Sequence, residues 1–232
     1  MLFRQLFDAE SSTYTYLLAD PGSGHAALVD PVLGQVERDL QLVRELGLTL
    51  THVLDTHVHA DHVTAASALR ARTGCRTVAG TLGADCADIR VRHGEVLHVG
   101  ALAVRVLATP GHTDDSVSFL AEDCVFTGDS LMVRSCGRTD FQNGDAGALY
   151  DSVHAHLFTL PDATRVYPGH DYKGRTATTV GEEKRHNARL AGRTREEFIQ
   201  LMGSLGLPPP RLLDQAVPAN RACGQLPAVP QG

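Results

Sequence analysis

The sequence predicts an α/β protein in which two mixed β-sheets pack face to face, with helices on the outside. Strand-like segments pair as hairpins near the start, and strands then alternate with helical segments. The length of 232 residues allows one sizeable core, and 43% hydrophobic with 21% charged residues is typical of a globular protein. We therefore expect a single domain over residues 1–232, with a short helical and loop-rich C-terminal extension from about residue 181.

The first third of the chain carries clear strand and helix patterns. Segments 2–7, 14–19 and 25–30 are rich in aliphatic and aromatic residues, and the turn sequence DPGSG separates the last two. A helix follows, because Val36, Leu40, Val43 and Leu46 recur at helical spacing and Gly47 can cap its end. Next we expect a buried strand at 51–54, a helix at 63–73 and a strand at 76–79.

The remaining elements are predicted in the same way. Strands are expected at 95–99, 102–108, 116–120, 124–127 and 165–167. Helices are expected at 145–158, 181–190 and 194–205, followed by three prolines at 208–210 and a loop-rich end.

Charge and cysteine content limit the function classes. A formal net charge of −6 argues against a nucleic-acid surface, which needs clustered Lys and Arg, but not against a small anionic ligand. No apolar run approaches the length of a membrane-spanning helix. The five cysteines are scattered and form no CxxC pair, so neither a disulfide framework nor a thiolate zinc site is indicated. A reducing, cytoplasmic setting is the simplest expectation.

A histidine-rich segment carries the strongest functional signal. The sequence THVHADH at 56–62 places His57, His59, Asp61 and His62 directly after a predicted strand. Three further candidates, His112, Asp129 and His170, follow later strands, each beside a glycine that lets the backbone turn sharply near a metal. Imidazole and carboxylate ligands suit Zn, Fe or Mn. The sequence therefore predicts a metal centre.

This set of residues resembles the ligand pattern of the metallo-β-lactamase superfamily, which implies the αββα sandwich with the metal at one edge between the sheets. In the hydrolases of that superfamily, such as glyoxalase II, all seven residues hold two metals bridged by a water. In its iron dioxygenases, one Fe(II) is held by the first histidine, a later histidine and the aspartate. Those positions here are His57, His112 and Asp129.

Further segments are similar to the persulfide dioxygenases, also called sulfur dioxygenases: SCGRTDFQ at 135–142, YPGHDY at 167–172, EKRHNARL at 183–190 and AVPAN at 216–220. The resemblance implies oxidation of glutathione persulfide with O2 to sulfite and glutathione, with one Fe(2+) per chain. The alternative is a glyoxalase II-like two-metal thioester hydrolase acting on S-acylglutathione, which metal type and stoichiometry would distinguish. A non-catalytic binding protein would require a broken site, and no ligand is missing. Whether the chain forms a homodimer is left open.

The dioxygenase resemblance also implies roles for the other residues. His59, Asp61, His62 and His170 are expected to orient the metal ligands and bound water through hydrogen bonds. Arg138 and Tyr172 are the candidates for holding glutathione, because a guanidinium can grip a carboxylate and a phenol can bond a peptide group. For Arg138 an internal salt bridge with Asp140 or Asp145 is an equal alternative.

Three residues receive weaker interpretations. Cys136 is expected to be a buried packing residue rather than a redox group. Asp115, in the sequence GHTDD, stands where many relatives have glycine, and Ala188 where a number of them have proline. Neither departure removes a metal ligand.

Overall fold

Two six-stranded β-sheets pack against each other in the computed structural model, which describes residues 1–226. The first sheet has the order β1-β2-β3-β4-β5-β6, antiparallel from β1 to β3 and parallel from β3 to β6. Its strands are β1 (Leu2–Asp8), β2 (Thr13–Ala19), β3 (His25–Val29), β4 (Thr49–Leu54), β5 (Arg76–Gly80) and β6 (Ile89–Val91).

The second sheet has the order β12-β11-β10-β9-β8-β7. Only β10 and β11 run parallel within the described part of this sheet. Its strands are β7 (Val96–Val99), β8 (Leu102–Ala108), β9 (Val117–Ala121), β10 (Cys124–Gly128), β11 (Arg165–Pro168) and β12 (Thr178–Thr179).

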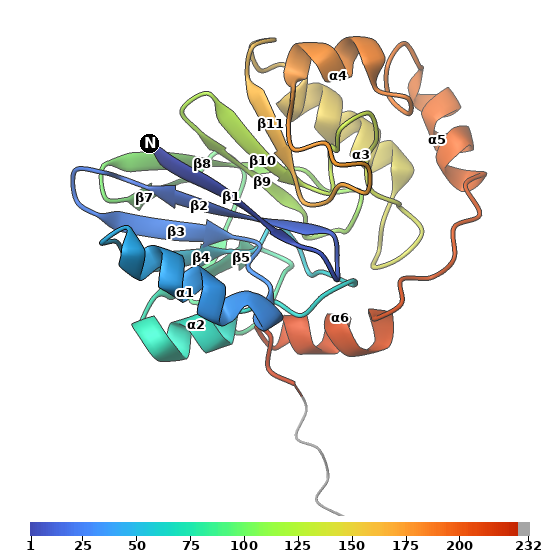
Figure 1. The fold of residues 1–232 in the computed structure, drawn as a ribbon. Helices are drawn as coiled ribbons and strands as arrows, with labels where there is room; N and C mark the ends of the chain where they lie inside the picture. Colours follow the sequence, from blue (N-terminus) through green and yellow to red (C-terminus); the bar gives the residue numbers. More distant parts are fainter. Residues whose placement is uncertain (227–232) are drawn as a thin grey trace, which may run out of the picture.

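Helices cover both outer faces of the pair of sheets (Figure 1). Helices α1 (Val36–Glu45) and α2 (Ala66–Thr73) lie against the first sheet, with a short 3-10 turn at Leu33–Gln35 before α1. Helices α3 (Ala146–Ser152), α4 (Val180–His186) and α5 (Arg195–Gly203) lie against the second sheet. Helix α6 (Leu213–Arg221) returns to the side of α2 (Figure 1). The predicted α/β sandwich with helices outside is confirmed.

The side chains of β2 show why the sheets stack. Tyr14, Tyr16 and Leu18 face the second sheet and join the core between the sheets. Leu17 and Ala19 point to the other face and pack with α1 and α2. Because successive side chains of a strand alternate between faces, a strand buried on both sides reads as a continuous apolar run, as β2 does.

Most predicted elements lie within a few residues of the observed ones, and three differences have physical causes. The helix expected at 145–158 is α3 followed by a π-helical turn at Val153–Leu157. The end expected to be loop-rich contains α6, whose pattern is obscured by the interior Pro218. Strands β6 and β12 are too short to show a period. Residues 227–232 lie outside the described residues, so the expected loop-rich end is tested only up to residue 226.

The cysteine interpretation needs a correction. Cys86 and Cys223 form a disulfide, although 137 residues separate them and the sequence indicated no disulfide framework. Their Cα atoms lie 6.0 Å apart because α6 returns to the first sheet. Cys75, Cys124 and Cys136 are buried free thiols.

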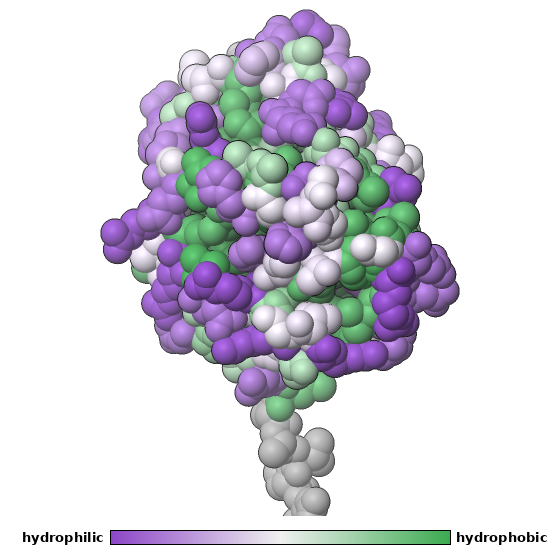
Figure 2. All heavy atoms as spheres, turned by 90° about the vertical axis from the view of Figure 1, so that its left-hand side faces the viewer, coloured by the Kyte–Doolittle hydropathy of each residue, from purple (hydrophilic) through white to green (hydrophobic). Residues whose placement is uncertain are grey.

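The end of the sheets that carries the β2–β3 turn is mainly hydrophilic, with hydrophobic patches interrupted by polar residues (Figure 2). Among the described residues, no helix has the length and apolar character needed to cross a membrane. Many of the buried polar side chains lie at the opposite end of the sheets, just beyond the C-terminal ends of β3, β4, β10 and β11.

Candidate metal centre

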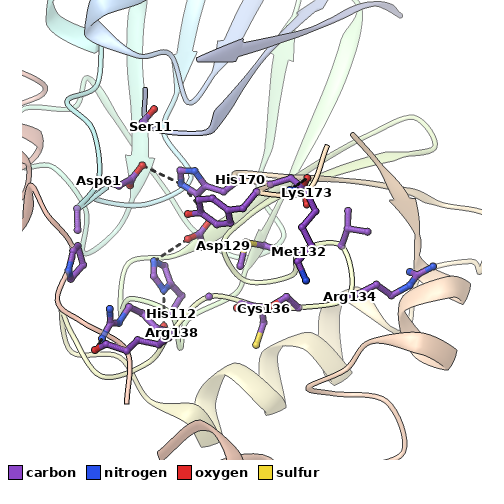
Figure 3. A pocket seen from close by; sticks show the side chains of 18 of the residues that line it. Ser11, Asp61, His112, Asp129, Met132, Arg134, Cys136, Arg138, His170 and Lys173 are labelled. Atoms are coloured by element: carbon purple, nitrogen blue, oxygen red, sulfur yellow. Dashed lines mark hydrogen bonds and ion pairs between the residues drawn. The ribbon is translucent and has the colours of Figure 1, made fainter. Parts of the chain in front are cut away.

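The seven predicted ligands meet at one edge of the sandwich, between the sheets. Figure 3 shows four of them, Asp61, His112, Asp129 and His170. The segment after β4 supplies four of them, the loop between β8 and β9 supplies His112, and Asp129 and His170 follow β10 and β11. They converge because parallel strands end at the same edge of a sheet, and because β4 and β9 approach each other across the sheets through Val117 N–H and Thr56 O at 2.8 Å.

The ligands form two clusters, within each of which one ligand atom per residue lies within 4.8 Å of the others. The first cluster contains His57, His112 and Asp129, and the second contains His59, Asp61, His62 and His170. The structure therefore brings together every ligand that the sequence predicts.

Hydrogen bonds in the first cluster leave two imidazole lone pairs free. Thr56 donates its hydroxyl to Asp30 Oδ2 at 2.8 Å, so its oxygen accepts from His57 Nδ1 at 3.0 Å. His112 Nδ1 donates to the carbonyl of Arg138 at 2.7 Å. Both Nε2 atoms thus carry lone pairs, and His112 Nε2 lies 3.6 Å from Asp129 Oδ2. Asp129 Oδ1 is buried without a hydrogen-bond partner, which fits a metal ligand.

The second cluster is arranged in the same way. His59 Nε2 faces Asp30 Oδ1 at 3.1 Å and His62 Nδ1 faces Asp61 Oδ2 at 3.0 Å, and the other ring nitrogen of each is buried and unpaired. His170 Nδ1 donates to Ser12 O at 3.2 Å, while its Nε2 lies 3.4 Å from Asp61 Oδ2 and 3.7 Å from Asp129 Oδ1. This cluster also has the donor set of a metal site.

Burial and neighbouring charges set the protonation of these groups. Burial lowers the pKa of His57 and of His59 well below the usual range, so both rings are neutral and able to bind a cation. Burial also disfavours the charged form of His170, but Asp61 and Asp129 outweigh it and raise the pKa of His170 to about 9. In the metal-free protein His170 therefore holds a proton between the two carboxylates.

Glycines allow the late ligands to approach. Gly111 has φ of 137°, and a Cβ there would lie 2.2 Å from the backbone nitrogen of Leu149. At Gly128, where φ is 49°, a Cβ would lie 2.4 Å from Thr56 Oγ1. A side chain at either position would clash and strain the backbone, so the turns that carry His112 and Asp129 both require glycine.

Three supporting residues were not assigned this role from the sequence. Asp30, at the end of β3, accepts from Thr56 N–H at 2.7 Å, from the Thr56 hydroxyl and from His59. Asp115 accepts from Val58 N–H at 2.9 Å, so the departure from glycine adds a support to the ligand segment. Asn220 bonds to the same segment from α6. The sequence had singled out Asp115 as a departure from relatives and Asn220 within AVPAN, and Asp30 as the end of a predicted strand, but it did not show what any of them contacts.

A cavity of about 730 Å³ opens beside the clusters, with Asp61, His112, Asp129 and His170 in its wall (Figure 3). Residues 207–212, between α5 and α6, border it on another side, and we call this segment the strap. Cys136 also lines the cavity but is buried, and burial raises the pKa of its thiol to about 11. A neutral packing thiol is the role expected for it.

The two substrate candidates both line this cavity. Arg138 forms a two-pronged ion pair with Asp140 at 2.6 and 2.7 Å and donates to the strap carbonyls of Leu207 and Pro208. The internal salt bridge weighed for Arg138 is therefore present. Tyr172 is 72% exposed, and its ring lies parallel to that of His170 with centroids 6.2 Å apart.

Other basic side chains were missed by the sequence interpretation. Lys173, Arg175 and Arg211 line the cavity, and none of them makes a side-chain ion pair or hydrogen bond to the described residues. Nothing in their local sequence marks them, because the loop after β11 and the strap meet only in the folded chain.

The role of Asp30 can be tested by replacing it with asparagine, because Asp30→Asn retains the shape but points an N–H₂ group at one of three donors. We expect metal affinity to fall about 10- to 100-fold, as is usual for partners of metal-bound histidines. Cobalt(II) titration of metal-free protein measures this, with Asp85→Asn, at a carboxylate that is 89% exposed, as the control. Equal affinities for the two variants would show that Asp30 does not orient the ligands.

Comparison with known proteins agrees with this geometry. A family model described as the Metallo-beta-lactamase superfamily matches residues 9–85 and 87–170. The human protein "Persulfide dioxygenase ETHE1, mitochondrial" is 48% identical over 227 residues, which is 97% of this chain and 89% of the relative. A Bradyrhizobium hydroxyacylglutathione hydrolase is 41% identical over 201 residues, which is 82% of this chain and 76% of that protein.

The crystal structure of ETHE1 from Myxococcus xanthus is similar in both sequence and fold. It is 66% identical and superimposes with a TM-score of 0.96, covering 97% of this chain and 100% of that chain. The chain therefore belongs to the metallo-β-lactamase superfamily and, within it, to the persulfide dioxygenase family.

Proposed function

We propose that this protein is an iron-dependent persulfide dioxygenase that oxidises glutathione persulfide with O2 to sulfite and glutathione. The observation that carries the proposal is the first cluster, in which two imidazoles and one carboxylate come together and hydrogen bonds orient the two rings. Two histidines and one carboxylate on one face of a metal are the donor set of non-haem Fe(II) oxygenases. Family membership over nearly the whole chain supports the same activity.

His57 Nε2, His112 Nε2 and Asp129 would hold the metal. A bound ferrous ion would supply the redox chemistry that the reaction of O2 with the persulfide needs. The overall reaction consumes one O2 and one water per persulfide, and it yields sulfite, the free thiol and protons.

The surrounding residues orient the ligands and control charge. Thr56 and Asp30 fix the His57 ring, and the Arg138 carbonyl fixes the His112 ring. His170 Nε2 lies 3.4 Å from Asp61 and 3.7 Å from Asp129, and in the metal-free protein its positive charge lowers the pKa of both carboxylates and keeps them ionised. We assign His59, Asp61, His62 and His170 to this orienting role.

Substrate binding is assigned to the cavity. Glutathione carries two carboxylates, and Lys173, Arg175 and Arg211 supply cations that are free to receive them. Tyr172, on the rim beside His170, is placed to contact the peptide part. Arg138 retains unused donor capacity on Nη1, but its contacts to Asp140 and the strap make it first a support for the cavity wall.

The two-metal thioester hydrolase remains the second candidate. The unpaired, buried Nδ1 of His59 and Nε2 of His62 favour it, because they could bind a second ion. The comparisons weigh against it, since the chain is 48% identical to the human persulfide dioxygenase over 97% of its length, but 41% identical to the hydroxyacylglutathione hydrolase over 82%.

We also propose a cytoplasmic location, as the sequence led us to expect, and a single domain that acts on small molecules rather than on nucleic acid or membranes. In a reducing compartment Cys86 and Cys223 would be thiols rather than the disulfide of the structure.

Ligand replacement separates metal-binding residues from orienting residues. His57→Ala, His112→Ala and Asp129→Ala should each lose the iron, because each removes one of three protein ligands. Asp61→Ala should keep most of the iron and lower turnover, by about 10- to 100-fold. Iron per chain is measured by elemental analysis of each purified variant. If Asp61→Ala emptied the site as fully as Asp129→Ala, Asp61 would have to be reassigned as a ligand.

Substrate binding is tested by removing single cations from the cavity. Lys173→Ala and Arg211→Ala should each raise the KM for glutathione persulfide about tenfold, because a hydrogen bond to a charged group contributes ~1.5 kcal/mol or more. Arg105→Ala, which removes a cation outside the cavity, is the matched control. The value of kcat and the iron content should stay unchanged.

The same assay decides the role of Arg138. A higher KM for Arg138→Ala at unchanged melting temperature would support direct contact with glutathione. An unchanged KM with a lower melting temperature would make Arg138 a structural partner of Asp140 and the strap. KM values equal to the control for both Lys173→Ala and Arg211→Ala would contradict the cation assignment.

A further inference from the structure

Asn220, in the segment AVPAN on α6, directs its whole side-chain amide at the metal-binding segment. Its Nδ2 donates to His59 O at 2.9 Å and to His62 O at 2.8 Å, and its Oδ1 accepts from Thr64 N–H at 2.9 Å. The side chain is only 3% exposed. Both N–H groups and the oxygen of the amide therefore bond to residues more than 150 positions earlier in the chain.

The metal-binding segment needs such a partner. After β4 ends at Leu54, Asp55 N–H still donates to Val78 O in β5 and Thr56 O accepts from Val117 N–H in β9. From His57 to His62, however, the backbone makes no hydrogen bond to the backbone of a described strand. Buried carbonyls without partners are costly, and Asn220 satisfies two of them. His59 and His62 are the residues whose carbonyls it holds, and each presents an unpaired ring nitrogen to the site. The position of Asn220 thus sets where these imidazoles point.

The C-terminal end of helix α6, just after Asn220, is fixed to the first sheet and to α2 by several contacts. The carbonyl of Cys223 accepts from Ser67 N–H at 2.9 Å, at the start of α2. The Cys86–Cys223 disulfide joins the same point to the loop after β5. Gly224 packs on the segment itself, because a Cβ there would lie 2.0 Å from Thr64 O. In contrast, the strap that precedes α6 is exposed over most of its length.

We propose that Asn220 is a positioning residue of the metal centre, and that the Cys86–Cys223 disulfide holds Asn220 in register with the ligand segment in protein where the two cysteines are oxidised. In a reducing compartment Asn220 would act without this covalent support. This inference rests on the proposed metal centre, but it does not depend on which reaction that centre performs. Reduction by a dithiol would add two electrons and two protons, break the S–S bond and leave two protein thiols and a cyclic disulfide. Because Cys86 is more exposed than Cys223, its sulfur is the accessible point of attack.

The test uses cobalt(II) titration of the metal-free full-length protein, with the absorption spectrum and the melting temperature as further readouts. Asn220→Ala and Asn220→Ser should weaken cobalt binding about 10- to 100-fold and shift the visible bands of the bound ion. Serine keeps a polar group at position 220, so this variant guards against a simple loss of fold. Gln215→Ala, on an exposed position of the same helix, is the matched control and should behave as wild type.

The role of the disulfide is tested by the same cobalt(II) titration. Cys86→Ser should weaken cobalt binding in the same direction as Asn220→Ser and should not respond to dithiothreitol. Wild-type protein that is reduced with dithiothreitol, freed of the reductant without air and then titrated should behave like Cys86→Ser, while alkylation and mass spectrometry report the pairing of the two cysteines. A wild-type affinity that ignored dithiothreitol, with both thiols then alkylated, would overturn the role of the disulfide.

Two outcomes overturn the positioning role and are distinguishable. Folded Asn220→Ala and Asn220→Ser with wild-type affinity and spectrum would show that Asn220 only packs α6, even if the melting temperature fell. A wild-type protein that bound no cobalt would overturn the metal centre itself, and this inference with it.

Discussion

A buried imidazole can bind a metal only if one ring nitrogen keeps its proton and shares it with an acceptor in the protein. In this protein every histidine of the two clusters has such an acceptor, and the acceptors come from different parts of the chain. They are the Thr56 hydroxyl, the carboxylates of Asp30 and Asp61, and the carbonyls of Ser12 and Arg138. The centre is thus built by the outer hydrogen bonds as much as by the ligands.

Asp30 shows how the fold meets this requirement. It ends β3, which runs parallel to β4, so its carboxylate reaches the first residues of the ligand segment. There it serves Thr56 and His59 together and links the two clusters. Helix α6 supports the same segment from the other side through Asn220. The metal-binding loop is therefore held by the sheet and by the C-terminal helix at once.

The sandwich and the ligand set could be predicted because their signals are local. The apolar composition of segment 14–19 indicates a buried strand. The spacing of His57, His59, Asp61 and His62 can be read directly from the seven-residue segment 56–62. The later ligands could be added because each follows a strand and stands beside a glycine. Resemblance to a family then allowed a division of roles that spacing alone does not determine.

The remaining features could not be predicted because they depend on contacts between distant segments. Arg138 was equally compatible with a substrate contact or a salt bridge until the strap was placed against it. The Cys86–Cys223 pair exists only because α6 returns to the first sheet, and α6 was hidden by Pro218. The free cations of the cavity likewise come from two segments that meet only after folding, within a chain whose net charge is −6.

The account depends most directly on the metal and on the fate of O2, which can be measured on one sample. Protein purified without air is analysed for metal and then given glutathione persulfide in an oxygen electrode. The account predicts one iron per chain and one O2 consumed for each sulfite formed. Two zinc ions per chain, with hydrolysis of S-acylglutathione and no uptake of O2, would contradict it.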